Sequence, residues 1–309
     1  MVTQPVRFAI AIPQVVNKRG AEPAALATFL AQAEALGYES AWVMEQILGR
    51  AACLEPVTLL TYAAAVTRTL RLGSAVLLTP LRNPVQLAKS LATLDQLSGG
   101  RLIVGVGLGG NPRIYPAFGL SPERRVRRFA EGIRLMKRLW TEERVTVDGE
   151  FWKLENAAME PKPVQKPHPA LWFGARQPAA LTRAVELGDG WIGAGSSSTA
   201  EFREQAAHVR ASLAEAGRDP ATFPIAKRVY LALDRDKGRA LARLREWFGT
   251  FYGNPGLADR VAIVGDTDEV IAGLNEVRAA GAGLLLLNPV FDELRHLELL
   301  AGEVVPGVA

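Results

Sequence analysis

The chain has 309 residues, of which 49% are hydrophobic and 22% are charged, a composition typical of a globular protein with a substantial core. Its formal net charge of +4 suits an anionic ligand, but the arginines lie mostly among acidic residues in the helical segments 124–138 and 235–245, so we expect no nucleic-acid partner. The single cysteine, Cys53, excludes an intrachain disulfide, and segment 1–14 lacks the pattern of a signal peptide. No apolar run approaches the roughly 18 residues of a membrane span, so we expect no membrane contact. The single cysteine is compatible with a reducing compartment, and we expect a cytoplasmic protein.

Apolar runs and helical patterns alternate along the chain. The runs predict eight strands, at 7–12, 40–44, 72–78, 102–106, 170–173, 190–193, 224–233 and 283–287. Apolar spacing and capping residues predict helices at 23–36, 56–67, 85–97, 121–140, 178–187, 199–216, 237–251 and 270–280, with a terminal helix after Asp292. Apolar strands without internal alternation fit a parallel sheet that is covered on both faces. The count and the alternation therefore predict an α/β fold, a closed TIM (β/α)8 barrel, rather than a doubly wound sheet.

One segment, 141–169, interrupts this alternation. It contains a predicted β-hairpin around Asp148-Gly149, RVTVDGEFWKL, followed by a loop with four prolines. The segment is too short to be a domain, and no linker-like stretch divides the rest of the chain. We therefore expect one domain over residues 1–309 with an insertion at 141–169.

The run 105–110 has the form GxGxxG and follows a predicted strand. In a Rossmann fold a helix begins at these glycines, so that its free N–H groups meet a pyrophosphate. Here Pro112 and Pro116 follow and prevent a helix, and the next helix is predicted only from Ser121. We therefore reject a Rossmann site and interpret the run as a tight turn, or as backbone that approaches a flat ligand closely.

Two later turns are rich in small residues and precede predicted helices. The segment 174–178 places an arginine beside a glycine at a helix N-terminus, and the segment 193–198 is rich in glycine and serine. Both could bind an anion such as phosphate, because the N–H groups at a helix N-terminus are free. Both are equally compatible with ordinary turns, one with a surface arginine and one with an N-cap, so these alternatives stay open.

The residues offer little for metal or nucleophilic chemistry. The three histidines, His168, His208 and His296, fall in a proline-rich loop and on two helices, and no HxH or HExxH motif occurs, so we predict no metal centre. No Ser-His-Asp arrangement can be assembled, and Lys227 in the seventh predicted strand is the one candidate for a Schiff-base lysine. A bound cofactor is then the simplest source of the chemistry.

Four segments resemble the superfamily of bacterial-luciferase-like monooxygenases, a group of flavin- and deazaflavin-dependent oxidoreductases. They are AEALGYESAWVMEQ (33–46), LGSAVLLTPLRNPVQLAKSLATLDQLSGGRLIVGVGLGG (72–110), RLMKRLWTEERVTVDGEFWKL (134–154) and PKPVQKPHPALWFGARQPAALTRAVELGDGWI (161–192). Together they cover most of the chain. The resemblance implies a TIM-type barrel with a flavin or deazaflavin ring at the carboxyl ends of its strands.

The resemblance also implies which residues bind the cofactor. In the family a bulge of the third strand, often with a cis peptide, supports the back of the ring. The matching residues here are Ser74, Ala75 and Val76, with Ala75–Val76 as the expected cis bond. The residues implied near the ring or its side chain are Thr79, Gly107 and Asn111. Those implied at the phosphate end are Gly174, Ala175, Arg176, Gly193 and Gly195.

Two positions depart from the family pattern. Many members carry an acidic residue followed by His after the second strand, whereas this chain has Glu45-Gln46, and glutamine cannot donate a proton as an acid at neutral pH. An acidic residue that some deazaflavin members carry after the fourth strand matches Gly110. We therefore carry over Glu45 alone as a catalytic residue, with a purely hydrogen-bonding role as the alternative.

The function that the resemblance implies is hydride transfer between reduced coenzyme F-420 and a small organic substrate. The region 43–110 and the basic charge favour this deazaflavin, with its polyanionic tail, over FMN. One alternative is an FMN-dependent monooxygenase that uses O2, and another is a non-catalytic flavin-binding protein on the same barrel. A third is a cofactor-free lyase or hydrolase that depends on Lys227 or on a metal.

The resemblance implies a homodimer, for which the apolar helices 56–67 and 85–97 could supply the interface. A lid over the site is expected from segments 111–120, 141–169 and 251–260, because binding loops on a rigid scaffold are where such functions concentrate.

Overall fold

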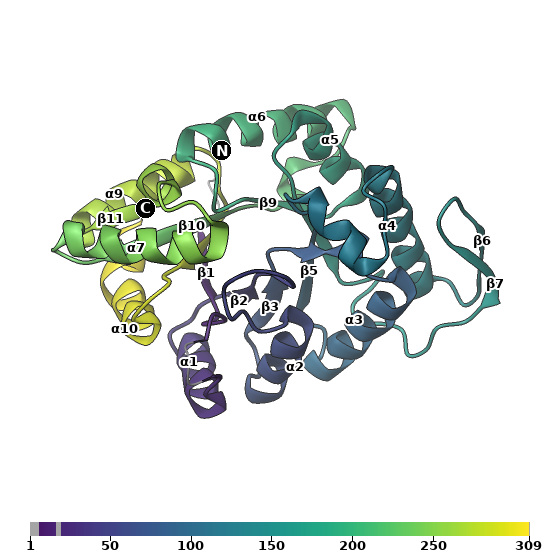
Figure 1. The fold of residues 1–309 in the computed structure, drawn as a ribbon, viewed down its shortest axis with the longest axis horizontal. Coiled ribbons are helices and arrows are strands. Elements are labelled where there is room, and N and C mark those ends of the chain that lie inside the picture. Colours follow the sequence, from purple (N-terminus) through teal and green to yellow (C-terminus); the bar gives the residue numbers. More distant parts are fainter. Residues whose placement is uncertain (1–5, 17–19, 309) are drawn as a thin grey trace.

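The computed structural model describes residues 6–16 and 20–308 of the chain, which form a barrel of parallel strands with helices around it (Figure 1). The barrel strands, in order around the barrel, are β1 (Arg7–Ala11), β2 (Ser40–Val43), β3 (Arg71–Ser74), β5 (Leu102–Gly107), β8 (Ala170–Gly174), β9 (Gly190–Gly193), β10 (Ile225–Leu233) and β12 (Leu284–Asn288). Each strand pairs in parallel with the next, and β12 pairs with β1 to close the barrel. The predicted TIM barrel is therefore confirmed.

The barrel interior is filled by small and aliphatic side chains around two tryptophans. Trp42 of β2 and Trp172 of β8 have ring centroids 5.4 Å apart, and Ile103 and Ala226 belong to the same buried cluster. Side chains alternate between the two faces of a strand, so the intervening residues point outwards against the helices. This alternation decides which residues at the strand ends face the mouth of the barrel.

Ten helices pack around or beside the barrel in the described ranges. They are α1 (Pro23–Ala35), α2 (Pro56–Val66), α3 (Pro84–Ser98), α4 (Arg125–Thr141), α5 (Pro178–Leu187), α6 (Thr199–Glu215), α7 (Lys237–Tyr252), α8 (Leu257–Val261), α9 (Thr267–Ala279) and α10 (Glu293–Leu299). Proline opens α1, α2, α3 and α5, where its missing N–H leaves no helical hydrogen bond unmade. The predicted cap of α9 is confirmed, because Asp266 and Glu269 each accept a hydrogen bond from the other's backbone N–H.

Two predictions for the segment before α4 are wrong. Ser121 does not start a helix: its hydroxyl accepts a hydrogen bond from the amide of Glu123 at 3.1 Å within a turn, and α4 begins only after Arg124, whose φ is 55°. The segment Pro112–Phe118, expected to be irregular, forms a 3-10 helix. Asn111 caps it by accepting a hydrogen bond from the amide of Arg113 at 3.0 Å, and the 3-10 pattern tolerates the proline that an α-helix would exclude.

The sequence also misses a short strand, β11 (Ile263–Gly265), and the helix α8 before it. The nine-residue β10 is longer than the other barrel strands, and β11 pairs with its far end, Leu231–Leu233. A three-residue strand is too short to carry a readable pattern of its own. It forms because β10 leaves an unpaired strand edge beyond the barrel.

The predicted hairpin is present as β6 (Val145–Asp148) and β7 (Lys153–Ala157), which pair antiparallel. Asp148 pairs with Lys153, so the connection is four residues long rather than two. Figure 1 shows this hairpin standing outside the ring of helices, beside α4.

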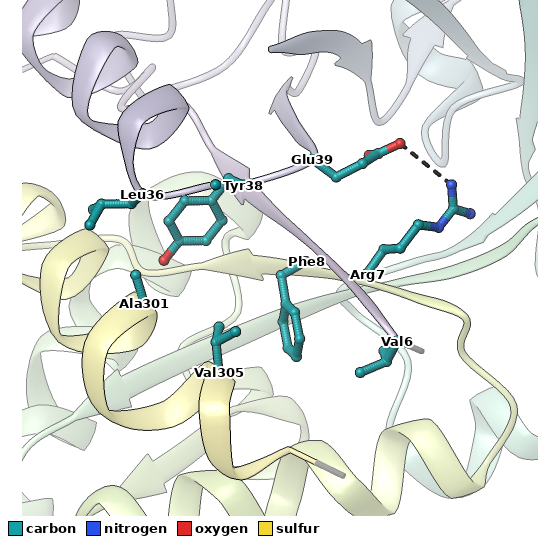
Figure 2. Close-up of a pocket in the computed structure, with 9 residues that line it drawn as sticks. Val6, Arg7, Phe8, Leu36, Tyr38, Glu39, Ala301 and Val305 are labelled. Carbon is teal, nitrogen blue, oxygen red and sulfur yellow. Dashed lines mark hydrogen bonds and ion pairs between the residues drawn. The ribbon is translucent and has the colours of Figure 1, made fainter. Parts of the chain in front are cut away.

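A cavity of about 240 Å³ lies at the amino ends of the strands, opposite the face where TIM-barrel active sites occur (Figure 2). It is lined from β1 by Arg7 and Phe8 and from the α1–β2 connection by Tyr38 and Glu39. Arg7 and Glu39 form an ion pair at 3.5 Å, and the Tyr38 hydroxyl donates to the carbonyl of Leu297 at 2.9 Å. The Tyr38 hydrogen bond ties α10 to this end of the barrel, and the Arg7–Glu39 ion pair joins β1 to the segment before β2, so we assign the cavity lining a structural role.

Candidate active site

The third barrel strand is interrupted where a bulge was predicted. β3 stops at Ser74, the peptide Ala75–Val76 is cis as expected, and the strand resumes as β4 (Leu77–Leu78), which pairs with β5. The Ser74 hydroxyl bridges the interruption: it accepts a hydrogen bond from the amide of Gly105 and donates one to the carbonyl of Gly105, both at 2.9 Å. The sequence predicts one strand over 72–78, with a bulge implied by the family resemblance, and the structure divides this segment into two strands.

Three glycines make room for this bulge. A methyl group at Gly105 would lie 1.6 Å from the carbonyl oxygen of Ser74. A methyl group at Gly107 or Gly174 would lie 2.6 or 2.9 Å from the side chain of Val76. Because only glycine fits at such distances, β5 and β8 accept the bulge at these positions. We call Ser74–Val76 together with Gly105, Gly107 and Gly174 the bulge wall.

Glu45, the predicted catalytic residue, is held in a buried ion pair. Its side chain has 0% exposure, one carboxylate oxygen accepts from the amide of Leu78, and the other accepts from Arg82, whose Nε lies at 3.1 Å. Arg82 also pairs with Glu55 at 2.7 Å. Burial raises the pKa of Glu45, whereas Arg82 and the Leu78 amide act in the opposite direction. All its strong partners are internal, so Glu45 fixes the backbone that follows the bulge.

Two polar groups near this wall have no partner among the described residues. Thr79, directly after β4, is buried, and its hydroxyl makes no hydrogen bond. Gln46 donates through Nε2 to the carbonyl of Phe251 in α7 at 2.8 Å, and its buried Oε1 has no partner. Buried polar atoms are normally hydrogen-bonded, so such atoms at a barrel mouth indicate a place for a ligand.

The structure adds a buried cation that sequence reasoning missed. Arg228 of β10 points into the barrel mouth and has 6% exposure. Its Nε donates to Asn288 Oδ1 at 2.8 Å, and its Nη1 donates to the carbonyl of Ala75 at 3.3 Å. Its Nη2 contacts the Met44 sulfur and the Tyr230 hydroxyl. The available signal was Lys227-Arg228, two cations inside an otherwise apolar run.

Aromatic residues from β10 and α7 stand beside Arg228. The hydroxyls of Tyr230 and Tyr252 are 2.7 Å apart, and Trp247 stacks on Phe251 with ring centroids 4.7 Å apart. Trp247 and Phe251 are partly buried, and Tyr252 is 37% exposed. These aromatic rings make one side of the barrel mouth apolar, and the hydroxyls of Tyr230 and Tyr252 lie beside Arg228.

The two turns that precede α5 and α6 come together as expected. We call segments 175–178 and 194–198 the tail turns. Arg176 of the first turn reaches Ser196 of the second at 3.4 Å, and the buried Ser197 hydroxyl has no partner among the described residues. Arg260 of α8, which the sequence did not single out, donates to the carbonyl of Ser196 at 3.0 Å and pairs with Glu201 at 2.8 Å.

Lys227 lies beneath the second tail turn and outside the barrel. Its ammonium donates to the carbonyls of Ala194 and Ser197, the latter at 2.9 Å, and lies 5.9 Å from the centroid of the Phe202 ring in α6. Burial lowers its pKa to about 7. Because Lys227 faces α6 rather than the barrel interior, it is not placed to form a Schiff base with a substrate in the mouth.

The remaining expected residues have structural contacts of their own. Asn111 is exposed and caps the 3-10 helix, and the Ala175 carbonyl accepts from the Trp191 indole at 3.0 Å. Methyl groups at Gly193 and Gly195 would lie 2.5 and 2.6 Å from the rings of Phe202 and Tyr230. Among the described residues, no group of three His, Cys, Asp or Glu side chains could hold a metal ion, and no helix is long and apolar enough to cross a membrane.

Known proteins with similar sequences or folds include flavin- and deazaflavin-dependent enzymes. An F-420-dependent glucose-6-phosphate dehydrogenase from Kineococcus radiotolerans is 35% identical over 238 residues, 73% of this chain and 68% of that protein. An FMNH(2)-dependent dimethylsulfone monooxygenase from Pseudomonas putida is 32% identical over 70% of this chain and 63% of that protein.

A solved structure of an F-420-dependent secondary alcohol dehydrogenase shares the fold. It superposes with a TM-score of 0.86 over 99% of this chain and 100% of that chain, at 20% sequence identity. The model of the luciferase-like monooxygenase family matches residues 6–283, so the chain belongs to that family.

Proposed function

We propose that this protein is an oxidoreductase that transfers a hydride between bound coenzyme F-420, or FMN, and a small organic substrate, with coenzyme F-420 favoured. Its family membership supports the reaction class, because relatives with either cofactor are oxidoreductases. The observation that carries the proposal is the pair of buried, unpartnered hydroxyls of Thr79 and Ser197. Each costs about 1–3 kcal/mol when nothing bonds to it, so both ends of the site favour a polar ligand.

The bulge wall suits the flat face of a ring. Ala75 and Val76 are apolar and pack against the barrel interior cluster, and Gly107 and Gly174 behind Val76 leave no side chain that would project further. The Thr79 hydroxyl follows this apolar surface directly and would hydrogen-bond the edge of the ring. An aromatic ring in this place would exclude water from the mouth of the barrel.

The tail turns suit an anionic tail. Arg176 and Arg260 flank the serines of the second turn, Lys227 places a third cation beneath it, and Glu201 is the one carboxylate paired there among the described residues. The N-termini of α5 and α6 add their dipoles. This excess of positive charge favours coenzyme F-420, whose tail carries more negative charge than that of FMN.

The residues of the chain bind and orient, and when bound the cofactor supplies the hydride chemistry. In this proposal Glu45 is a positioning residue, because both its carboxylate oxygens hold the Leu78 amide and Arg82. Gln46 ties the loop after β2 to the end of α7 through Phe251 and so sets the width of the mouth. Neither side chain is placed as a free proton donor.

Cofactor titration tests the proposal. Purified protein is titrated with oxidised coenzyme F-420 and with FMN, and binding is followed by the absorbance and fluorescence of the ring. We expect saturable binding of coenzyme F-420 in the micromolar range or tighter and weaker binding of FMN. Binding of FMN alone would redirect the proposal to an FMN-dependent monooxygenase, and binding of neither would contradict it.

A non-catalytic cofactor-binding protein is the second candidate, and the absence of a free acid at Glu45-Gln46 favours it. Turnover separates the two. Oxidation of the reduced cofactor or reduction of the oxidised cofactor with any member of a panel of alcohols, aldehydes, ketones and acids supports the enzyme. Tight binding with no turnover on the whole panel supports the binding protein.

The same proposal includes a cytoplasmic homodimer. A groove of about 420 Å³ between α2 and α3 is lined by three apolar residues, of which Leu97 is 61% exposed, and by five polar ones: Val57, Leu94 and Leu97 with Thr58, Thr61, Lys89, Ser90 and Thr93. Apolar residues in such a groove favour a second copy of the chain. Light scattering should give twice the monomer mass, and Leu97→Glu should shift it toward the monomer. A monomer in the wild type would contradict this part.

A further inference from the structure

Arg228 has one N–H group left for a ligand. A guanidinium carries five N–H donors. Nε bonds Asn288, and Nη2 faces the Met44 sulfur and the hydroxyls of Tyr230 and Tyr252, the last at 3.5 Å. Nη1 carries two hydrogens and makes one long hydrogen bond, 3.3 Å, to the Ala75 carbonyl. Its second hydrogen is therefore available at the barrel mouth.

The charge of Arg228 is not balanced inside the protein. Its partners are an amide, a carbonyl, a thioether and hydroxyls, and no Asp or Glu in the described ranges forms an ion pair with it. By contrast, the buried carboxylate of Glu45, near the mouth, is paired with Arg82. A buried charge without a counter-ion is costly, so the fold reserves this position for an anion that arrives with a ligand.

The surroundings of Arg228 indicate what carries that anion. The bulge wall lies on β3, β5 and β8, with the Val76 side chain directed at the glycines of β5 and β8. Arg228 instead joins β10 to Asn288 of β12 and Met44 after β2. The aromatic cluster of Tyr230, Trp247, Phe251 and Tyr252 stands next to it. An anionic head beside an apolar, aromatic wall matches an organic acid rather than a phosphorylated sugar.

We propose that Arg228 is a specificity-determining residue that binds the carboxylate of an aromatic or apolar organic acid, with the Tyr252 hydroxyl as a second donor. That this acid is the substrate rests on the proposed function above. The binding of a carboxylate by Arg228 does not, because it follows from charge and geometry alone. The acid would present its apolar part to Trp247 and Phe251.

The test compares two probes that differ in charge and not in shape. Phenylacetate and phenylacetamide are titrated into the purified protein, without cofactor and with coenzyme F-420 bound, by calorimetry. The wild type should bind phenylacetate at least about tenfold more tightly, because a charge-assisted hydrogen bond is stronger than a neutral one by about that factor. Arg228→Gln should remove the preference, and Tyr252→Phe should reduce it.

Arg245→Gln is the matched control. Arg245 lies on α7 and pairs with Asp259 at the surface, so its loss should leave the preference unchanged. Equal affinity of the two probes in the wild type overturns the proposal, as does a preference that survives Arg228→Gln. If Arg228→Gln does not fold, Tyr252→Phe decides the question. The proposal is overturned if this variant prefers phenylacetate over phenylacetamide as strongly as the wild type does.

The cofactor-bound arm separates this proposal from the previous one. A preference that disappears when coenzyme F-420 is bound would show that Arg228 serves the cofactor ring and would overturn the assignment to substrate. Failure of both cofactors to bind would contradict the proposed function while the probe affinities of the cofactor-free protein still decide the role of Arg228.

Discussion

The bulge wall adjoins the first tail turn at the end of β8, yet the wall and the tail turns depend on different physical interactions. The wall is buried and depends on space: Gly105, Gly107 and Gly174 each lie too close to the Ser74–Val76 backbone or side chains to carry a methyl group. The tail turns are partly exposed and depend on charge, through Arg176 and Arg260.

This difference governs how each region should respond to change. Packed contacts tolerate almost no added volume, because the surrounding strands cannot move apart without losing the barrel. Charged contacts at a partly exposed surface change gradually with each residue and are screened by salt. Substitutions in the wall should therefore affect folding, and substitutions in the turns should affect affinity.

The largest expected effect is that of Gly105→Ala. The added methyl would lie 1.6 Å from the Ser74 carbonyl oxygen, so the bulge must move, and we expect the free energy of unfolding to fall by about 3 kcal/mol or more. Urea unfolding measures it. Gly110→Ala is the control, because nothing lies within 4 Å of its added methyl and its stability should stay near that of the wild type. Equal stability of both variants would break the distinction between the regions.

The next effect concerns the ion pair behind the wall. Arg82→Met leaves the fully buried Glu45 without its cation, and we expect a loss of about 3 kcal/mol, because an uncompensated buried charge remains. Arg82 opposes the effect of burial on the pKa of Glu45, so this pKa should rise further when Arg82 is removed. Adding Glu45→Gln should restore a large part of the stability in a double-mutant cycle.

Arg138→Met is the control for that cycle. Arg138 pairs with Glu142 at 2.6 Å on the surface, where solvent screens the interaction, so unfolding should change little. Additive effects of Arg82→Met and Glu45→Gln would show that the pair is not a coupled unit.

The wall was largely predictable from the sequence, and the reason is its dependence on backbone and volume. Glycines at fixed positions in an apolar run, such as Gly105 and Gly107, leave a visible mark, and the family resemblance located Ala75–Val76. The barrel followed from alternation of strands and helices. What failed were short elements, β11 and the 3-10 helix at Pro112–Phe118, whose form depends on tertiary neighbours.

The charged part of the site was less predictable, because the register of a strand decides whether a given side chain points into the barrel or out of it. Lys227 and Arg228 are adjacent in sequence, and the alternation of β10 sends the first out toward α6 and the second into the mouth. A shift of one residue would exchange them. Arg260 reaches Ser196 only through the fold, since α8 is far from the turn in sequence. The two cations in an apolar run are visible in the sequence, but no local pattern shows which of them faces the mouth or that Arg260 reaches Ser196.

A smaller effect, in affinity rather than folding, is expected from Lys227. With a pKa of about 7, the ammonium is charged below pH 7 and neutral above it. A bound anionic tail favours the charged form, so cofactor affinity should fall as the pH rises through 7 and above, by at most about tenfold per pH unit. Arg228 lowers this pKa and Glu201 raises it, and neither changes in the variant.

Lys227→Met should bind the cofactor more weakly at pH 6 and show a flatter pH profile than the wild type. Because both proteins are titrated with the same cofactor, protonation of the ligand cancels in the comparison. If cofactor affinity depended on pH in the same way in both proteins, Lys227 would act only by holding the turn. The charge of Lys227 would then not contribute to cofactor binding.

The smallest effects come from two buried hydroxyls without a partner among the described residues, that of Thr79, which follows the bulge wall, and that of Ser197 in the second tail turn. Thr79→Val and Ser197→Ala should each leave the cofactor-free protein as stable as the wild type or slightly more so, since an unsatisfied polar atom is removed. Each should weaken cofactor binding by about 0.5–1.5 kcal/mol, the net value of one hydrogen bond.

Titration of FMN and of riboflavin, the same ring without phosphate, separates the effects of the two variants. Thr79→Val should weaken both ligands equally because it acts on the ring, whereas Ser197→Ala should weaken FMN alone. An equal loss for both ligands in both variants would place the two hydroxyls at the same end of the cofactor and would overturn the division of the site.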